Sequence, residues 1–505
     1  MAAVLALAAC SGPDARGGDA PRPSATPSAG ASATVAAARW KACPEVPRRL
    51  VGRGAPNMRY DCATIAVPRN WSAPGGGTFD ISLIRARNKD QHDRIGSLLV
   101  NPGGPGVSGV NAAVYLSFGK AYGGVSDDVS RRFDIIGFDP RGVDRSSPLE
   151  CVSDQQMDQS FGYDPDPDTQ AAFDGLVTLS RQMGEACQAR YGDLLRLYST
   201  EQAARDIDAI RAAVGDPKLT YLGYSYGTLL GATYAQLYPR NVRALVLDGA
   251  VDPRQDFVAG SQSQARGFEL AFDNFAKWCA NTPRKCPIAP DARGTVERAI
   301  EKGRTDPIVG ARGRKATAGW IFYAVVDSLY TQTGWQRLAE AIDKLDRGDP
   351  SSAFDLADSY AERDPNGHYS NLFDANIAIT CADQQAAPTV AQVRTLQSEW
   401  RKKYPLFGAP LAVGMLPCTQ WPGQHDPYPT GAADGSPPIL VVGTTGDPAT
   451  PYEQSPRLAQ MLGVGRLLTW NGEGHTAYPK STCVVSAVDS YLIDLMVPAA
   501  GTRCS

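Results

Sequence analysis

LTYLGYSYGTLLGATYA, residues 219–235, is the stretch that decides the fold of this chain. The run Leu219 to Leu222 predicts a strand, and Thr228 to Ala235 predicts a helix. The pentapeptide from Gly223 to Gly227 joins them. A turn this tight brings backbone segments close together and strains its central residue, so glycines are needed on both sides. Ser225 is therefore predicted as a nucleophile raised on a strand-turn-helix elbow.

The pentapeptide pattern is too short to be specific, so the partners of Ser225 must be found elsewhere. A serine hydroxyl needs a base, and the base needs an acid that orients it. Among four histidines, His475 alone follows a predicted strand, in a glycine-containing loop. Asp447 follows the preceding strand, which gives the chain order Ser, Asp, His. Glu473 is the alternative acid, but it lies only two residues before the base.

The negative charge that develops during acyl transfer requires backbone N–H donors. Tyr226, directly after the nucleophile, is predicted to supply one of them. The second is expected from the loop after the strand Ser97 to Val100, which reads Asn101-Pro102-Gly103-Gly104-Pro105-Gly106. We assign it to Gly104, because Pro105 has no N–H and Gly103 is expected to be used in the turn.

Short apolar runs that end in Gly, Asp or Asn alternate with helical patterns, as in a parallel sheet with crossover helices. The predicted sheet strands are Ser97–Val100, Phe133–Phe138, Leu219–Leu222, Ala244–Leu247, Ile439–Val442 and Leu467–Trp470, with antiparallel runs at 63–67 and 79–84 before them. A long insertion, residues 253–436, contains helical patterns at 268–278, 318–329, 335–345 and 390–404. We interpret it as a helical lid inserted late in a doubly wound sheet.

The chain has 505 residues, of which 43% are hydrophobic and 20% charged, with a formal charge of −3. Such a chain can bury a large core, and its length suggests more than one domain. The balanced charge gives no support for nucleic acid or an anionic membrane surface as a partner. We divide the chain into a signal segment (1–10), a flexible tether (11–38), a first core part (39–252), the lid (253–436) and a second core part (437–505).

The N-terminal segment Met1 to Cys10 is apolar and ends in Leu7-Ala8-Ala9-Cys10, which resembles a bacterial lipobox. An ordinary secretory signal with a chance cysteine is the alternative, and no basic residue precedes the apolar run. We expect a secreted protein or one anchored to the outer face of the bacterial membrane through a lipid on Cys10. No later run is long enough to span a bilayer.

Ten of the eleven cysteines remain when Cys10 is set aside. An even number in an exported chain predicts disulfides. Pairing between neighbours is our hypothesis, namely Cys43–Cys62, Cys151–Cys187, Cys279–Cys286, Cys381–Cys418 and Cys483–Cys504. A metal site is not expected, since no CxxC pair occurs and histidine is scarce, and no cofactor is implied.

Four motifs taken together resemble the secreted bacterial tripeptidyl aminopeptidases, which are α/β-hydrolase peptidases related to the proline iminopeptidases. The motifs are Asn101-Pro102-Gly103-Gly104-Pro105-Gly106, Asp139-Pro140-Arg141-Gly142, Gly223-Tyr224-Ser225-Tyr226-Gly227 and Gly446-Asp447-Pro448-Ala449-Thr450-Pro451. The resemblance implies an α/β-hydrolase fold and release of short peptides from a free N-terminus. It also implies Ser225, Asp447 and His475 as the triad, with Gly104 and Tyr226 as oxyanion donors.

An exopeptidase must recognise the substrate ammonium, and a carboxylate from the lid would serve this purpose. Asp383 is the first candidate and Glu453 a second. Peptides are the expected substrates. The alternatives are a carboxylesterase or amidase acting on small secreted metabolites, a non-catalytic binding protein on the same scaffold, and a structural envelope lipoprotein.

Overall fold

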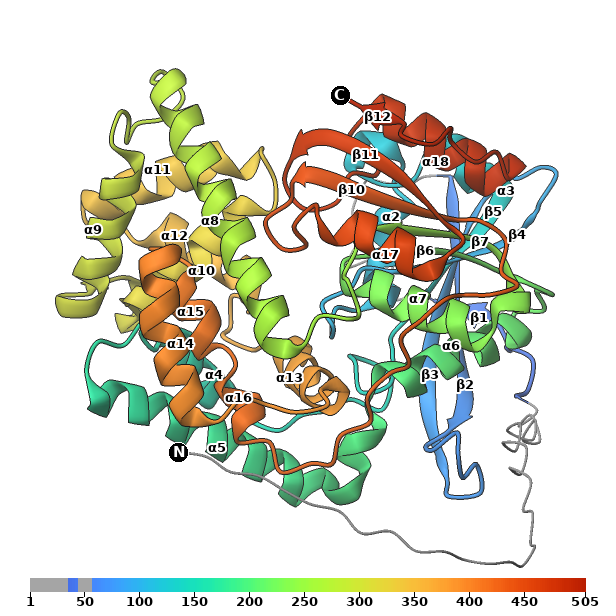
Figure 1. Cartoon of the computed structure of the whole chain (residues 1–505), viewed down its shortest axis with the longest axis horizontal. Helices are drawn as coiled ribbons and strands as arrows, with labels where there is room; N and C mark the ends of the chain where they lie inside the picture. The colour runs from blue at the N-terminus through green and yellow to red at the C-terminus, as the bar shows by residue number, and fades with distance from the viewer. Residues whose placement is uncertain (1–34, 44–56) are drawn as a thin grey trace, which may run out of the picture. The chain divides into compact units, whose positions relative to one another are not determined.

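A computed structural model describes residues 35–43 and 57–505, and Val35–Ser505 form one compact unit (Figure 1). The predicted signal segment with Cys10, and the tether up to residue 34, lie outside the described residues. The predicted tether extends to residue 38, and its last residues contact the folded core. Val35 and Ala38 pack against the core, and the Ala38 N–H donates to the Ala213 carbonyl over 2.8 Å.

The central sheet has ten strands in the order β1-β2-β3-β5-β4-β6-β7-β10-β11-β12. Pairing is antiparallel from β1 to β5 and parallel from β5 to β12. The strands are β1 Lys41–Ala42, β2 Met58–Pro68, β3 Thr78–Asn88, β4 Gly96–Asn101, β5 Phe133–Phe138, β6 Leu219–Tyr224, β7 Val242–Asp248, β10 Ile439–Gly446, β11 Gly465–Glu473 and β12 Arg503–Cys504. Every predicted strand is present. Parallel strands end at a common edge, so the loops after β4, β6, β7, β10 and β11 meet there.

Helices cover both faces of the sheet, because successive strand residues point to opposite sides. Leu98 and Val100 of β4 belong to one apolar cluster, which includes Val484 of α18. Leu99 belongs to the other cluster, which includes Leu230 of α7. The covering helices are α2 Gly109–Leu116, α3 Asp127–Arg132, α6 Thr200–Ala213, α7 Tyr226–Leu237, α17 Gln454–Leu462 and α18 Thr482–Asp494. The molecule is thus an α/β sandwich with the sheet buried in its middle.

The predicted helical lid lies between β7 and β10, and in Figure 1 its helices gather to the left of the sheet. The lid contains α8 Phe257–Asn281, α9 Ala292–Thr305, α10 Ala318–Leu329, α11 Gly334–Asp346, α12 Ser351–Ala361, α13 Leu372–Asp383, α14 Val390–Lys403, α15 Gly408–Val413 and α16 Leu416–Thr419, with a small hairpin of β8 Ile308–Val309 and β9 Lys315–Ala316. All four predicted helical segments are helical. Helix α8 begins earlier than predicted, where Asp256 accepts the Ala259 N–H as an N-cap.

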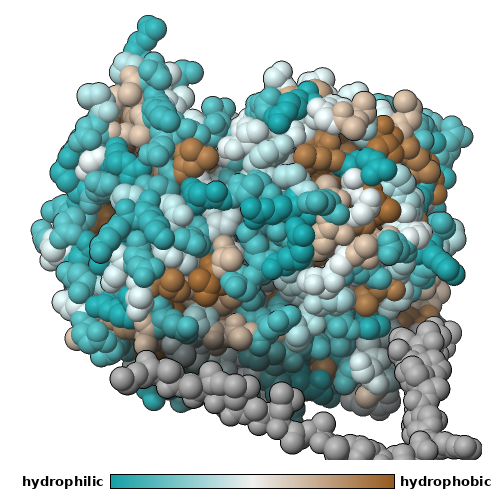
Figure 2. All heavy atoms as spheres, in the orientation of Figure 1, coloured by the Kyte–Doolittle hydropathy of each residue, from teal (hydrophilic) through white to brown (hydrophobic). Residues whose placement is uncertain are grey.

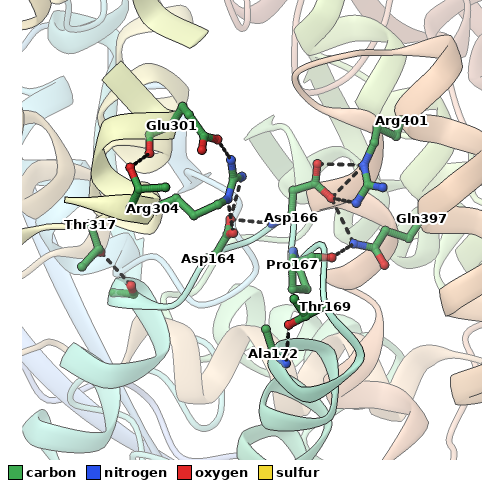
Figure 3. Close-up of polar contacts among 12 residues, drawn as sticks. Asp164, Asp166, Pro167, Thr169, Ala172, Glu301, Arg304, Thr317, Gln397 and Arg401 are labelled. Atoms are coloured by element: carbon green, nitrogen blue, oxygen red, sulfur yellow. Dashed lines mark hydrogen bonds and ion pairs between the residues drawn. The ribbon is translucent and has the colours of Figure 1, made fainter. Parts of the chain in front are cut away.

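A second helical insertion, between β5 and α6, was not predicted. It consists of α4 Asp154–Gly162 and α5 Gln170–Tyr191. The loop between these two helices is tied to the lid (Figure 3). Asp164 pairs with Arg304 of α9, while Asp166 pairs with Arg401 and accepts from Gln397 of α14 over 3.0 Å. This second insertion, which lies in the segment that we assigned to the first core part, therefore contacts the predicted lid.

The five predicted disulfides are all present. The structure joins Cys43 to Cys62, Cys151 to Cys187, Cys279 to Cys286, Cys381 to Cys418 and Cys483 to Cys504.

On the face drawn in Figure 2 hydrophilic residues predominate, and apolar residues occur in scattered groups. Within the described ranges, no helix has the length and apolar character needed to cross a membrane.

A buried ion pair fixes the motif that contains Arg141. The side chains of Arg141 and Asp206 are each 1% exposed, and the guanidinium donates to both carboxylate oxygens over 2.7 and 2.6 Å. Its remaining N–H groups donate to the carbonyls of Pro68, Arg69 and Leu197. The pair joins the end of β2, the loop after β5 and helix α6.

Asp206→Ala is expected to lower the free energy of unfolding by about 3–5 kcal/mol, because it leaves the Arg141 charge buried without its partner. Urea titration of both proteins measures the loss. Asp193→Ala, at an exposed acid, is the matched control and should lie within about 0.5 kcal/mol of the wild type. A loss below about 1 kcal/mol for the Asp206 variant would contradict a stabilising role of the buried Arg141–Asp206 pair.

Candidate active site

Ser225 stands at the sharp turn between β6 and α7, as predicted. Its backbone has φ 54° and ψ −125°, a strained region for a residue with a side chain. A Cβ on Gly223 would lie 2.4 Å from the Gly227 carbonyl oxygen, and one on Gly227 would lie 2.8 Å from that of Asn101. The close packing thus explains both glycines of the pentapeptide.

His475 and Asp447, which follow neighbouring strands, lie in direct contact. The His475 Nδ1 is 2.8 and 3.0 Å from the two carboxylate oxygens of Asp447. The carboxylate also accepts the N–H groups of Ala449, Thr450 and Thr476 and the Thr450 hydroxyl. Burial alone would raise the pKa of Asp447, but the His475 ring and the backbone donors hold this pKa below its usual value. Asp447 is therefore a fixed, ionised partner for the imidazole.

The end of β7 connects the serine turn to the histidine loop. The Ser225 N–H donates to the Asp248 carbonyl over 2.9 Å. The Asp248 carboxylate, fully buried, accepts the N–H groups of Ala477 and Tyr478 over 2.7–3.0 Å. A Cβ on Gly249 would lie 3.3 Å from the His475 Cε1. One short segment thus adjoins both the nucleophile and the base. Its only sequence signal is an Asp at the end of a predicted strand.

The lid also holds the histidine. The backbone N–H of His475 donates to the Tyr330 carbonyl over 2.8 Å, and the two side-chain rings meet edge to face with centroids 5.3 Å apart. The His475 side chain is 10% exposed. Tyr330 follows α10, so the lid forms one wall of the site. Sequence reasoning did not predict this contact.

The loop after β4 crosses directly over the serine turn. A Cβ on Gly103 would lie 2.9 Å from the Ser225 Cβ and 3.1 Å from the Tyr226 nitrogen. The Gly103 N–H donates to the Asn101 side chain over 3.0 Å, so it is used in the turn. In the part of the chain that the structure describes, the N–H groups of Gly104 and Tyr226 donate no hydrogen bond. Two free donors are thus present where the sequence predicted an oxyanion site.

Asp383, the first candidate for ammonium binding, ends α13 and is 7% exposed. Its oxygens accept the N–H and the hydroxyl of Thr200 over 2.8 and 2.6 Å. The Thr200 hydroxyl is also 2.6 Å from the Tyr226 hydroxyl. The carboxylate therefore anchors the start of α6 behind the serine turn, and these contacts do not favour the predicted role in ammonium binding.

Asp383 should make stability depend on pH. Burial raises its pKa to about 7, although hydrogen bonds from Thr200 favour the charged form. The usual value is about 3.9. The folded protein therefore holds this proton more tightly than the unfolded chain does. The contribution of Asp383 to the free energy of unfolding falls as pH rises from about 4 to about 7, by at most about 1.4 kcal/mol per pH unit. Asp383→Asn should remove this dependence.

Urea unfolding of wild type and Asp383→Asn at pH 5 and pH 7 measures the effect. The free energy of unfolding of the wild type minus that of the variant should be smaller at pH 7 than at pH 5. Asp355→Asn, at an exposed acid of α12, is the control. A difference independent of pH would refute the prediction.

Glu453, the second candidate for ammonium binding, precedes α17. Its carboxylate pairs with Arg266 of α8, and it lies 3.4 Å from the Ser263 hydroxyl. A lid cation thus already neutralises this acid.

Across residues 35–43 and 57–505, no group of three or more His, Cys, Asp or Glu side chains is arranged to hold a metal.

Two family models match separate parts of the chain. Residues 96–303 match the family model for the alpha/beta hydrolase fold, and residues 404–504 match the one for TAP-like protein. Serine protease Hip1 of Mycobacterium tuberculosis is 37% identical over 469 residues, 88% of this chain and 87% of that protein. Carboxylesterase B of the same species is 35% identical, with coverage of 96% and 93%.

A tripeptidyl aminopeptidase of Streptomyces lividans is 31% identical over 459 residues, 88% of this chain and 83% of its own. These matches extend over nearly all of the described core and lid, and they agree with the mostly parallel sheet and the serine turn. The chain therefore belongs to the tripeptidyl aminopeptidase-like family of α/β hydrolases and is a serine hydrolase.

Proposed function

We propose that this serine hydrolase is an exopeptidase that releases short peptides from free N-termini through an acyl-enzyme. The observation that carries the proposal is the bond from the His475 Nδ1 to the buried Asp447 carboxylate, beside the serine turn. This bond uses one ring nitrogen and leaves Nε2 to accept the Ser225 proton. Relatives named as a serine protease and a tripeptidyl aminopeptidase support peptides as the substrate class.

In the first step Ser225 Oγ attacks the scissile carbonyl carbon while its proton passes to His475 Nε2. The N–H groups of Gly104 and Tyr226 stabilise the oxyanion. His475 then protonates the leaving amine, and an acyl-enzyme remains. Water, deprotonated by His475, attacks the ester and releases the peptide. Asp447 fixes the ring orientation and stabilises its charged form in both steps.

A carboxylesterase is the second candidate, because one relative of similar identity carries that name. An ester substrate needs the same triad but no recognition of a free amine. Digestion of a defined peptide library, with mass spectrometry of the released fragments, separates the two. Release of fragments of two or three residues from free N-termini supports the exopeptidase. Turnover of p-nitrophenyl esters alone would overturn it in favour of the esterase.

We also propose that the enzyme acts outside the cytoplasm. Five disulfides support an oxidising compartment, and the lipobox-like sequence before Cys10 supports a lipid anchor. Fractionation of cells expressing wild type and Cys10→Ala tests both points. The anchored protein should move from the membrane fraction to the medium in the variant. Recovery of both proteins from the cytosol would refute export.

A further inference from the structure

We propose that Asp327, on lid helix α10, binds the N-terminal ammonium of the peptide substrate. The inference rests on the proposed exopeptidase function and names the residue that would make the enzyme require a free amine. Neither Asp383, enclosed by Thr200, nor Glu453, paired with Arg266, is available for this task.

Asp327 lies on the one stripe of α10 that is not buried. Of the twelve residues of this helix, ten are buried, and the exceptions are Tyr323 and Asp327. Tyr330, directly after the helix, is also partly exposed. Residues spaced by four and three positions lie on the same side of a helix. The two tyrosines and the carboxylate therefore share one accessible face.

This face leads to the histidine. The Tyr330 and His475 rings meet with centroids 5.3 Å apart, and Asp327 precedes Tyr330 by three residues, a helical rise of about 4.5 Å. The carboxylate thus lies on the order of 10 Å from the imidazole along this face. Three residues of an extended peptide span about 10 Å. An amine held at Asp327 therefore suits cleavage after the third residue.

The surroundings of Asp327 suit an ammonium group. Within the described residues no Lys or Arg forms an ion pair with its carboxylate. Arg337 of α11 acts only at longer range, and the Ser359 hydroxyl provides a hydrogen bond. Burial raises the pKa of Asp327. A partly desolvated carboxylate that forms no ion pair is an acceptor that an incoming ammonium would stabilise.

Aromatic rings complete the subsite. Tyr360 of α12 packs against both tyrosines of the α10 face, with its ring centroid 5.4 Å from that of Tyr323 and 6.3 Å from that of Tyr330. The Asp327 carboxylate is close enough to help raise the pKa values of the Tyr330 and Tyr360 hydroxyls, after the larger effect of burial. Aromatic faces beside a carboxylate attract an alkylammonium through cation–π interaction as well as ion pairing.

The test compares one tripeptide p-nitroanilide with its N-acetylated derivative, in which the terminal amine is an uncharged amide. For the wild type, kcat/KM should favour the free amine. Asp327→Asn should reduce this preference by at least about 30-fold, because a buried charge pair is lost. Most of the change should be a lower kcat/KM for the free-amine substrate. Asp327→Glu keeps the charge and should retain the preference within about threefold. Asp355→Asn, at an exposed acid of α12, is the matched control.

The ratio of the kcat/KM values for the two substrates does not depend on the amount of folded enzyme. If Asp327→Asn does not fold, Asp327→Ser takes its place with the same expected ratio. An unchanged ratio in a variant that still cleaves peptides would overturn the Asp327 assignment and leave the proposed function standing. If the wild type itself cleaves neither anilide but hydrolyses esters, the exopeptidase proposal fails, and the Asp327 assignment fails with it.

Discussion

Ser225→Ala is expected to lower kcat for peptide and ester substrates by about 10⁴- to 10⁶-fold, since it removes the atom that forms the acyl-enzyme. Stability should change little, because the strained φ of 54° belongs to the backbone and alanine fills less space than serine. Steady-state kinetics measure the loss, and thermal unfolding checks the fold.

A fluorophosphonate probe provides an independent readout for the same residue. It should label the wild type on Ser225 and leave Ser225→Ala unlabelled. Ser261→Ala, on lid helix α8, is the matched control and should label normally, because its hydroxyl donates only to the Phe257 carbonyl. Labelling of Ser225→Ala, or turnover close to that of the wild type, would overturn the nucleophile assignment.

Asp447→Asn is expected to lower kcat by about 10³- to 10⁴-fold with a much smaller change in KM. The Asn amide would donate to the His475 Nδ1, which favours the tautomer that carries its proton on Nε2. That tautomer cannot accept the Ser225 proton. Kinetics on a tripeptide anilide measure the effect.

Glu473→Gln tests the alternative acid under the same conditions. Its carboxylate accepts from the Asn274 side chain over 3.1 and 3.3 Å rather than from His475. A loss below about tenfold is expected for this variant. If Glu473→Gln proved as damaging as Asp447→Asn, the roles of the two acids would have to be exchanged.

The parts of the site that follow from local sequence could be predicted. The serine turn needs two close glycines, and the Asp and His loops need only a preceding strand, so Ser225, Asp447 and His475 follow from the strand series. The Gly103 N–H is used in the turn because Asn101 lies two residues before it. Each of these features depends on a few neighbouring residues.

The contacts that depend on distant segments could not be predicted. Asp383 is enclosed by Thr200, 183 positions earlier in the chain, and no local pattern indicates this neighbour. The Tyr330 carbonyl binds the His475 N–H only because the lid folds back over β11. Helix α5 was missed because it buries few residues, which are Phe173, Met183, Gly184 and Cys187. A weak apolar stripe gives little helical periodicity to read.

The order of the disulfides has a consequence for biosynthesis. The two cysteines of each pair are consecutive among the cysteines from Cys43 onward, and they lie at most 37 positions apart in the chain. No bridge encloses a cysteine of another bridge. A chain that emerges with its N-terminus first therefore presents each thiol with its correct partner before the next pair appears. Oxidation can proceed one loop at a time, without exchange of partners between distant parts of the molecule.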